Sequence, residues 1–241
     1  MTKPIVRFAL HRQHRVALSL AMFCVLARTE AATLNTTVQG FSSEFNVGAT
    51  DRRAIHCVDG SGLDANNPPG HTNQPNGFMW LNTGDGSFGG GADPHPNGDL
   101  AQITFNLGGL SSVDSFRVWN YNELNGFTDR SVQTLTISIA SSAGGPFTLL
   151  TDPNNNSTTW VFDQAPGTTG YTGQLFTLGT PFQAAFVRFD ILTNYDSAGT
   201  DHGFVGLSEI QFYGSPVPEP STWTLVGVGM IGLLGLRRRI S

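Results

Sequence analysis

The 241-residue sequence predicts an all-β fold, a jelly-roll β-sandwich, with an apolar segment at each end of the chain. The first observation is composition. Charged residues make up only 13%, with 29 glycines and 17 phenylalanines, which suits a loop-rich β fold better than a helical one. The second is that apolar and polar residues alternate with period two in several short segments bounded by turn residues. The third is that no helical periodicity of useful length lies between the two terminal segments.

Nine short segments carry the strand pattern. In residues 132–140, for example, Leu135, Ile137 and Ile139 face one way, and the polar residues between them face the other. Nine such strands in about 180 residues favour two packed sheets. The segments span residues 34–41, 102–107, 114–120, 132–140, 146–150, 158–162, 174–178, 184–192 and 204–213.

A long connection without strand pattern covers residues 64–99. It is rich in Gly, Pro and Asn and too long for a purely structural connection, so we expect a surface or binding loop. Residues 93–99 partly match an EF-hand calcium loop, but Thr104 stands where the closing Glu is needed, which favours a plain polar loop. Residues 84–91 are glycine-rich but contain no Lys and open no helix, which argues against a phosphate cradle.

The N-terminus has the pattern of a signal peptide over residues 1–31. Four Lys and Arg residues precede an apolar run at 16–27, and small residues follow, so we expect cleavage after Ala31 or Ala32. The alternative is a membrane anchor, but twelve apolar residues fall short of the ~20 that a helical span needs. The pattern therefore predicts export of the chain.

The C-terminus combines a Val-Pro-Glu-Pro corner, an apolar segment at 222–236 and an arginine cluster, in that order. Fifteen apolar residues are marginal for a helical span. Arginines favour the cytoplasmic side of a membrane, so the segment predicts a single transmembrane helix with the body on the far side. The corner and the cluster consist of Val217, Pro218, Glu219, Pro220, Arg237, Arg238 and Arg239.

These three parts resemble the PEP-CTERM sorting signal of bacteria. The resemblance implies recognition by exosortase and an exported protein that is anchored transiently in the inner membrane through its C-terminal helix. It also implies a final place at the cell surface or in an extracellular polysaccharide matrix. An ordinary tail anchor is the alternative. The expected organisation is a signal peptide at 1–31, a β-sandwich at 32–215 and a sorting signal at 216–241.

The expected sandwich is strongly acidic. Residues 32–215 hold five basic and sixteen acidic side chains. This balance repels nucleic acid and suits divalent cations. Removal of the signal peptide leaves Cys57 as the one cysteine of the sequence, so no intrachain disulfide can form. We expect a buried thiol rather than a nucleophile, because His56 would point away from Cys57 on a strand.

The body resembles the discoidin-like domains, also called coagulation-factor type C or galactose-binding-like domains. The segments that carry the resemblance are residues 54–64, 103–123, 134–150, 184–192 and 205–214. It implies a jelly roll that acts as a non-catalytic carbohydrate-binding module, with a site formed by the loops at one end of the sandwich. It also implies a possible structural calcium ion.

The resemblance places the calcium ligands at Asp59, in an early Asp-Gly turn, and at Glu209, on the last strand. Ser61 and Asp64 are neighbours in the same turn, and Asp64 is the third candidate ligand. Backbone carbonyls, which a tight turn can offer, would complete the six to eight oxygens that calcium takes. The alternative is that Asp59 only caps its own turn and that Glu209 is solvated.

A sugar site needs an aromatic face for apolar C–H groups and polar side chains for hydroxyls. Four residues near the expected loops are candidates: His71, Trp80, Trp160 and His202. The segment 119–123 with Arg130 offers similar chemistry, but we favour a structural reading, with Trp119 in the core and Glu123 paired with Arg130.

Catalysis finds little support in the motifs. The sequence holds no Gly-x-Ser-x-Gly elbow, no His-Glu-x-x-His and no Cys-x-x-Cys. We therefore expect a protein without enzymatic activity that binds extracellular polysaccharide. Two alternatives stay open: a purely structural surface or biofilm protein without a specific ligand, and a small glycan-active enzyme built on two carboxylates.

Overall fold

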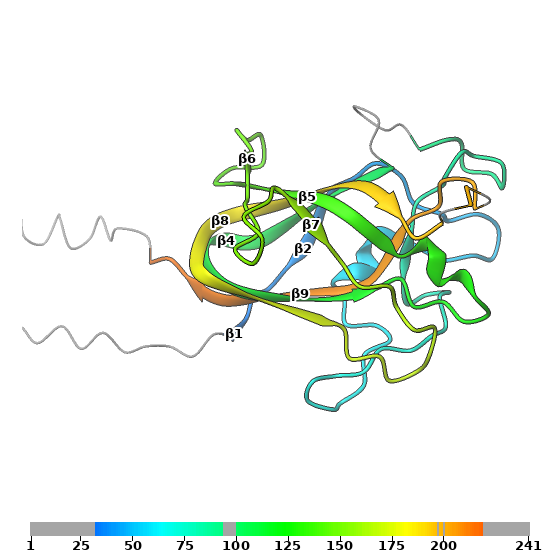
Figure 1. The fold of residues 1–241 in the computed structure, drawn as a ribbon, viewed down its shortest axis with the longest axis horizontal. Coiled ribbons are helices and arrows are strands. Elements are labelled where there is room, and N and C mark those ends of the chain that lie inside the picture. Colours follow the sequence, from blue (N-terminus) through cyan, green and yellow to red (C-terminus); the bar gives the residue numbers. More distant parts are fainter. Residues whose placement is uncertain (1–31, 94–99, 197, 200, 219–241) are drawn as a thin grey trace, which may run out of the picture.

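The computed structural model describes residues 32–93, 100–196, 198–199 and 201–218 (Figure 1). The predicted signal peptide and nearly all of the predicted sorting signal lie outside these residues. Within the described ranges the fold is all-β, as predicted, and its only helical elements are short 3-10 turns. No helix in this part of the chain is long and apolar enough to cross a membrane.

The strands follow the predicted segments closely, and the structure has two further strands of two residues each. The 3-10 turns span Ala54–Cys57 and Phe127–Arg130. The strands are β1 (Ala32–Thr33), β2 (Thr37–Phe41), β3 (Trp80–Leu81), β4 (Ala101–Asn120), β5 (Val132–Ala140), β6 (Thr148–Leu149), β7 (Thr159–Val161), β8 (Gln174–Asn194) and β9 (Gly206–Pro216). The short pairings β1 and β3 were not predicted.

Two pairs of predicted strands are single long strands. Segments 102–107 and 114–120 form β4, and segments 174–178 and 184–192 form β8. The pairing register of β4 shifts between Asn106 and Ser111, around Gly108 and Gly109, which both have positive φ. Glycine adopts that backbone without strain, so the Gly-Gly pair bends the strand instead of ending it.

These two long strands fold one nine-stranded sheet into two layers. The first half of β4 lies between β2 and the second half of β8, which in turn pairs with β5. The second half of β4 lies between β9 and the first half of β8. Figure 1 shows the bend, with the layers curving into each other at the end where both grey traces leave the body. The jelly-roll sandwich is thus continuous rather than made of two separate sheets.

The core lies between the two layers. Phe105 on β4 and Phe212 on β9 meet across it with ring centroids 5.8 Å apart, and Phe116 on β4 meets Trp160 on β7 at 5.6 Å. All four rings are fully buried. Each large apolar side chain buried in this way contributes ~1.5–3 kcal/mol of transfer free energy.

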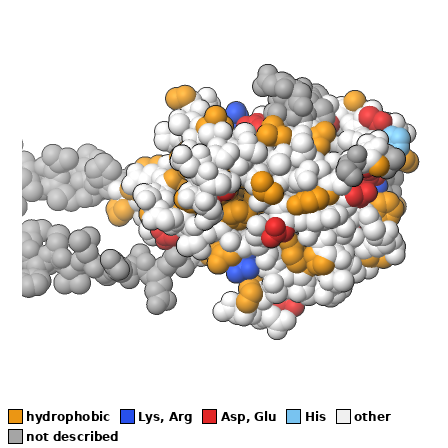
Figure 2. All heavy atoms as spheres, viewed as in Figure 1, with side chains coloured by type: hydrophobic (Ala, Val, Ile, Leu, Met, Phe, Trp, Pro, Cys, Tyr) orange, Lys and Arg blue, Asp and Glu red, His pale blue; other side chains and the backbone are white. Residues whose placement is uncertain are grey.

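The chain enters and leaves the sandwich at the same end. Ala32 pairs with Gly214 and Thr33 with Tyr213, so the first strand is hydrogen-bonded to the last. The long loops gather at the opposite end (Figure 1). Most of the face drawn in Figure 2 is neither charged nor hydrophobic, and its charged side chains are few and scattered.

Candidate functional site

The structure buries three of the four residues predicted to bind a ligand, two of them tryptophans. Trp80 and Trp160 both have 0% exposure, and their indole N–H groups donate to the Ser43 and Leu150 carbonyls. Neither ring has a face open to solvent, which a stacked sugar would need. The sequence placed them near loops, but each belongs to a short strand, and its ring is buried in the core.

His71, the third predicted residue, is also fully buried. Its Nδ1–H donates to the Thr72 carbonyl at 2.8 Å, and its backbone bridges Leu63 and Tyr171. Burial lowers the pKa of the imidazole, which favours the neutral form. His71 therefore holds loops together and presents no surface to a ligand in this structure.

His202, the fourth predicted residue, lies exposed at the loop end. Its Nδ1 is 3.0 Å from Asp85 Oδ2, and its φ of 56° is unusual for a residue other than glycine. The ring of Phe88 packs edge-on against it, with centroids 5.1 Å apart. The structure thus brings one predicted ligand residue together with an acidic and an aromatic side chain.

Phe88 is the most exposed of the large hydrophobic side chains in the described residues, at 58%. It sits in the glycine-rich loop 84–91, which folds back on itself: a Cβ on Gly84 would lie 2.4 Å from the His202 carbonyl oxygen, and one on Gly90 would lie 2.8 Å from the Thr83 methyl. The glycines therefore allow the close approach that holds Phe88 beside His202.

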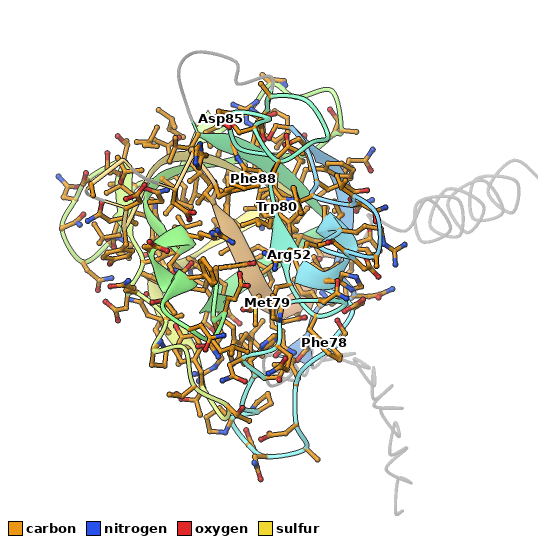
Figure 3. All side chains as sticks on the ribbon, turned by 90° about the vertical axis from the view of Figure 1, so that its right-hand side faces the viewer. Arg52, Phe78, Met79, Trp80, Asp85 and Phe88 are labelled. Carbon is orange, nitrogen blue, oxygen red and sulfur yellow. The ribbon has the colours of Figure 1, made fainter. Side chains whose placement is uncertain are left out.

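A small pocket opens beside Phe88, with a volume of about 140 Å³. We call it the phenylalanine pocket. Figure 3 looks onto this end of the molecule, with Arg52, Asp85 and Phe88 labelled. The side chains that line it are Phe45, Arg52, Leu81, Phe88, Arg130 and Phe204.

The two arginines of the pocket are held by a buried network. Arg52 donates from both terminal nitrogens to Glu123, at 3.0 and 3.1 Å, and to the Tyr121 hydroxyl at 2.7 Å. Arg130 donates to Asp201 at 2.6 and 2.8 Å and to Glu123 at 3.3 Å. Burial lowers the pKa of Arg130, but the Asp201 carboxylate outweighs burial, so the net shift is upward and the charge is kept.

This network confirms the structural reading of residues 119–123. Trp119 is buried, and the predicted pair of Glu123 with Arg130 is present at 3.3 Å. Asn120 and Asn122 donate to backbone carbonyls of neighbouring loops. Sequence reasoning missed Arg52 as the second partner, because 71 residues separate it from Glu123.

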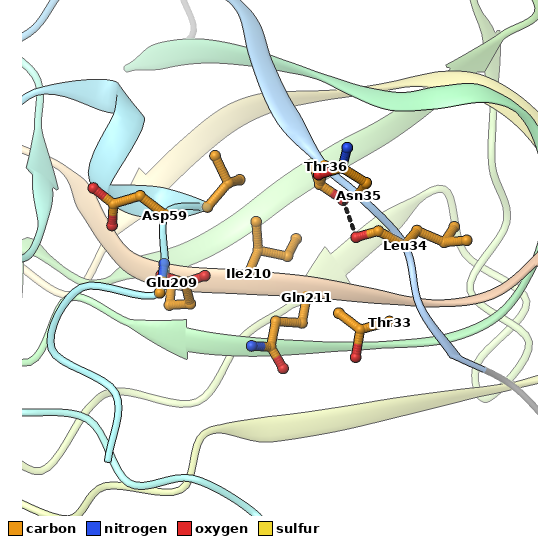
Figure 4. Close-up of a pocket in the computed structure, with 10 residues that line it drawn as sticks. Thr33, Leu34, Asn35, Thr36, Asp59, Glu209, Ile210 and Gln211 are labelled. Atoms are coloured by element: carbon orange, nitrogen blue, oxygen red, sulfur yellow. Dashed lines mark hydrogen bonds between the residues drawn. The ribbon is translucent and has the colours of Figure 1, made fainter. Parts of the chain in front are cut away.

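A second pocket, of about 230 Å³, is lined by both predicted calcium ligands, Asp59 and Glu209, and lies between the Asp-Gly turn, β9 and residues 33–36 (Figure 4). Glu209 is 1% exposed, so it is not solvated. In the described residues its one hydrogen-bond donor is the Gly60 N–H, at 3.2 Å. Burial, and then the nearby Asp59 carboxylate, raise the pKa of Glu209 to about 9.

Asp59 has more partners than Glu209. Its carboxylate accepts from the Ser61 N–H at 2.8 Å and lies 2.9 Å from His56 Nδ1. Burial raises the pKa of Asp59, but the hydrogen bonds from Ser61 and His56 together outweigh burial and lower it. Two neighbouring carboxylates, one of them deeply buried and poorly satisfied, fit the electrostatic demand of a bound cation.

Asp64 lies apart from this pair. Its carboxylate accepts from the N–H groups of Asn66 and Gly70, and it does not line the second pocket. Across the described ranges no three His, Cys, Asp or Glu side chains are arranged to hold a metal ion. A calcium ion at Asp59 and Glu209 would therefore take its remaining oxygens from backbone carbonyls and water.

Cys57 is free and fully buried, and burial raises its thiol pKa. The segment around it is a 3-10 turn instead of the strand assumed from the sequence. His56 points to Asp51 and Asp59, with ring nitrogens 3.1 and 2.9 Å from their oxygens. The thiol donates to the Leu207 carbonyl and has the inert surroundings of a structural cysteine.

A family profile described as "PEP-CTERM protein-sorting motif" matches residues 216–239. The chain carries this motif, as its corner, apolar segment and arginines predicted, and the motif implies export and processing by exosortase. Val217 and Pro218 lie at the edge of the described residues, and Glu219, Pro220 and the three arginines lie beyond them. In sequence, no curated protein matches the chain significantly.

Several solved structures are similar to the sandwich. The C-terminal domain of a chitobiase from Bacteroides fragilis aligns at 12% identity over 78% of this chain and 100% of that chain, with a TM-score of 0.50. A family 32 CBM from C. perfringens, in complex with galactose, aligns at 17% identity over 76% and 98%, with a TM-score of 0.44. An F5/8 type C domain from Bacteroides fragilis aligns at 15% identity over 76% and 99%, with a TM-score of 0.45.

At such identities the likeness concerns the fold alone. It agrees with the predicted jelly-roll sandwich, and the chitobiase domain carries that agreement because the other two scores lie below 0.5.

Proposed function

We propose that the protein is an exported surface or matrix component that binds extracellular carbohydrate at its loop end without catalysis. The observation that carries the proposal is Phe88, a half-exposed aromatic ring held by a glycine loop beside a pocket, at the end of the sandwich opposite β1. A mostly apolar pocket with a few polar side chains nearby has the composition typical of ligand sites.

The chemistry of this end suits a sugar. The Phe88 ring offers a flat apolar face for the C–H groups of a pyranose. His202 and Asp85 lie beside it and can exchange hydrogen bonds with hydroxyls. Because Glu123 and Asp201 neutralise Arg52 and Arg130, the site does not depend on an anionic ligand.

We also propose that calcium binds at Asp59 and Glu209 as a structural ion. When bound, the ion would supply the positive charge that the buried carboxylate pair lacks. Asp59 and the Gly60 backbone belong to the turn, and Glu209 belongs to β9, so shared ligation would fasten the turn to the sheet. The buried, poorly satisfied carboxylate of Glu209 supports this assignment.

The test is binding of the mature chain, beginning at Ala32, to a panel of polysaccharides with calcium and with a chelator. We expect saturable binding to at least one polysaccharide and a strong loss of affinity in Phe88→Ala. The matched control is Phe41→Ala, which removes an exposed phenyl ring that does not line the pocket.

Three outcomes separate the candidates. If Phe88→Ala binds the polysaccharide as tightly as the parent, the binding site lies elsewhere on the protein. If the folded protein binds no polysaccharide, a purely structural surface component is favoured. Turnover of a bound glycan that is abolished by one carboxylate substitution favours a small glycan-active enzyme.

A further inference from the structure

The phenylalanine pocket is too small for a whole sugar. Its volume of about 140 Å³ lies below the ~300–1,000 Å³ of pockets that enclose a complete small molecule. Phe88 is half-exposed at the edge of this pocket, whereas Leu81 and Phe204 are buried. A ring lying on Phe88 can therefore insert one substituent while the rest of the sugar stays outside.

The lining selects an apolar substituent. Four of the six side chains are hydrocarbon: Phe45, Leu81, Phe88 and Phe204. Three of them form one aromatic cluster, with Phe204 at 5.6 Å from Phe45 and 5.8 Å from Phe88 between centroids. A hydroxyl group placed against these rings would lose water without gaining a hydrogen bond from them, whereas a methyl group would gain from leaving water.

The two arginines do not turn the pocket into an anion site. Glu123 pairs with both guanidinium groups, and Asp201 pairs with Arg130 through two parallel hydrogen bonds. The two positive charges are thus matched by two carboxylates directly behind them. A carboxylate or sulfate on the ligand would have to displace these partners or face their repulsion.

The rim supplies the polar half of the site. His202 packs against the Phe88 ring, Asp85 contacts His202, and both polar side chains are exposed. Hydrogen bonds from the Ser87 side chain and then from the Ser87 N–H, followed by the His202 contact, lower the pKa of Asp85 to about 2. Asp85 therefore stays an acceptor for ring hydroxyls at any ordinary pH, and it holds His202 in place.

We propose that the phenylalanine pocket reads an uncharged, methyl-terminated substituent on a sugar ring, either an acetyl group or a 6-deoxy methyl group. The ring lies on Phe88, the methyl group enters the pocket and packs against Phe45 and Phe204, and Asp85 and His202 bind hydroxyls at the rim. The inference rests on the proposed carbohydrate binding and names the class of sugar. Burying one methyl group corresponds to a preference of about fourfold over the parent sugar.

The test compares sugars that differ only in the methyl-bearing group. The mature chain is titrated calorimetrically with chito-oligosaccharides against cello-oligosaccharides, with L-rhamnose against L-mannose, and with a polysaccharide before and after removal of its O-acetyl groups. We expect at least one methyl-bearing member to bind about four- to tenfold more tightly than its partner, and glucuronic acid to bind no better than glucose.

Two variants assign the preference to the pocket. Phe45→Trp narrows the pocket from the half-buried side, so it should abolish the preference while the parent sugar still binds. Phe88→Ala should weaken both members of each pair alike, and Phe41→Ala should change neither. Should Phe45→Trp fail to fold, saturation-transfer NMR on the unaltered protein replaces it, and the ligand methyl protons should receive the strongest saturation.

The outcomes separate this inference from the function on which it rests. Binding without a methyl preference overturns the inference and leaves carbohydrate binding intact. A preference that survives Phe45→Trp, or weak saturation of the methyl protons, places the substituent outside the pocket and overturns the inference as well. A folded protein that binds no sugar overturns both.

Discussion

Glu123 and Glu209 are both buried, at 7% and 1% exposure, but their surroundings differ. Glu123 accepts hydrogen bonds from two arginines and the Tyr121 hydroxyl. Glu209 has one backbone N–H and a second carboxylate nearby. The first glutamate completes a charge network, whereas the second leaves a demand for positive charge. Burial alone therefore does not separate a structural carboxylate from one that is ready to bind a cation; the partners do.

The largest effect should come from removing the satisfied glutamate. Glu123→Gln leaves Arg52 without its bidentate partner in a buried site, so we expect the free energy of unfolding to fall by about 3–5 kcal/mol. Urea denaturation measures this change. Asp163→Asn, which removes an exposed carboxylate, is the control, and an equal loss in both variants would contradict the distinction between the two settings.

Replacing Glu209 should raise the free energy of unfolding at neutral pH, whereas replacing Glu123 should lower it. A carboxyl whose pKa is higher in the folded chain keeps its proton there while the unfolded chain loses it. The free energy of unfolding of the calcium-free protein should therefore fall as the pH rises from 4.5 to about 9. Glu209→Gln cannot ionise, so it should be more stable than the parent by about 3 kcal/mol at pH 7 and little changed at pH 4.

Denaturation with urea in a chelator at both pH values checks this second prediction. The comparison fails if Glu209→Gln is destabilised at pH 7 or if the parent gains stability as the pH rises from 5 to 9.

Calcium should provide the missing charge at Glu209. At a concentration 100 times its dissociation constant, a bound ion raises the free energy of unfolding by about 2.7 kcal/mol. We expect this gain in the parent and in Asp64→Asn, because Asp64 lies outside the pocket. We expect no gain in Asp59→Asn or Glu209→Gln. Thermal unfolding with and without calcium measures this stabilisation. If calcium does not stabilise Asp64→Asn, Asp64 is a calcium ligand after all.

The smallest effect on stability should come from Phe88. Its exposed ring adds little to the core, so Phe88→Ala should change the free energy of unfolding by less than about 0.5 kcal/mol. Its affinity for a bound sugar should fall about three- to tenfold, because stacking on an aromatic ring is worth ~0.5–1.5 kcal/mol. A large loss of stability together with binding would show that Phe88 is part of the core.

Most of the strands could be predicted from the local alternation of apolar and polar residues. Residues 132–140 were predicted as a strand with the bounds that β5 has, since alternation is a property of neighbouring residues. The bend of β4 was not predicted, because a Gly-Gly pair marks a turn and a bent strand alike. The pair of Glu123 with Arg130 was predictable over seven residues.

The candidate site was harder to predict because its parts meet only in the folded chain. Trp80 and Trp160 looked suitable since tryptophan is a frequent sugar platform, but sequence position near a loop says nothing about which way a ring points. The sequence around Phe88 held one feature that could have predicted its exposure. Phe88 is a single large apolar residue among glycines, and it cannot be buried by periodic packing.

The pairing of β1 with β9 determines which end of the sandwich would face away from an attachment point. Because residues 216–218 leave the sandwich beside Ala32, an attachment through the sorting motif would hold the sandwich at that end, and the loops with Phe88 lie at the opposite end. The length of the sandwich would then set the distance of the proposed binding site from the attachment point. A fusion at the N-terminus would sit beneath the domain, whereas an insertion into the loop 84–91 would stand directly in front of whatever the protein meets.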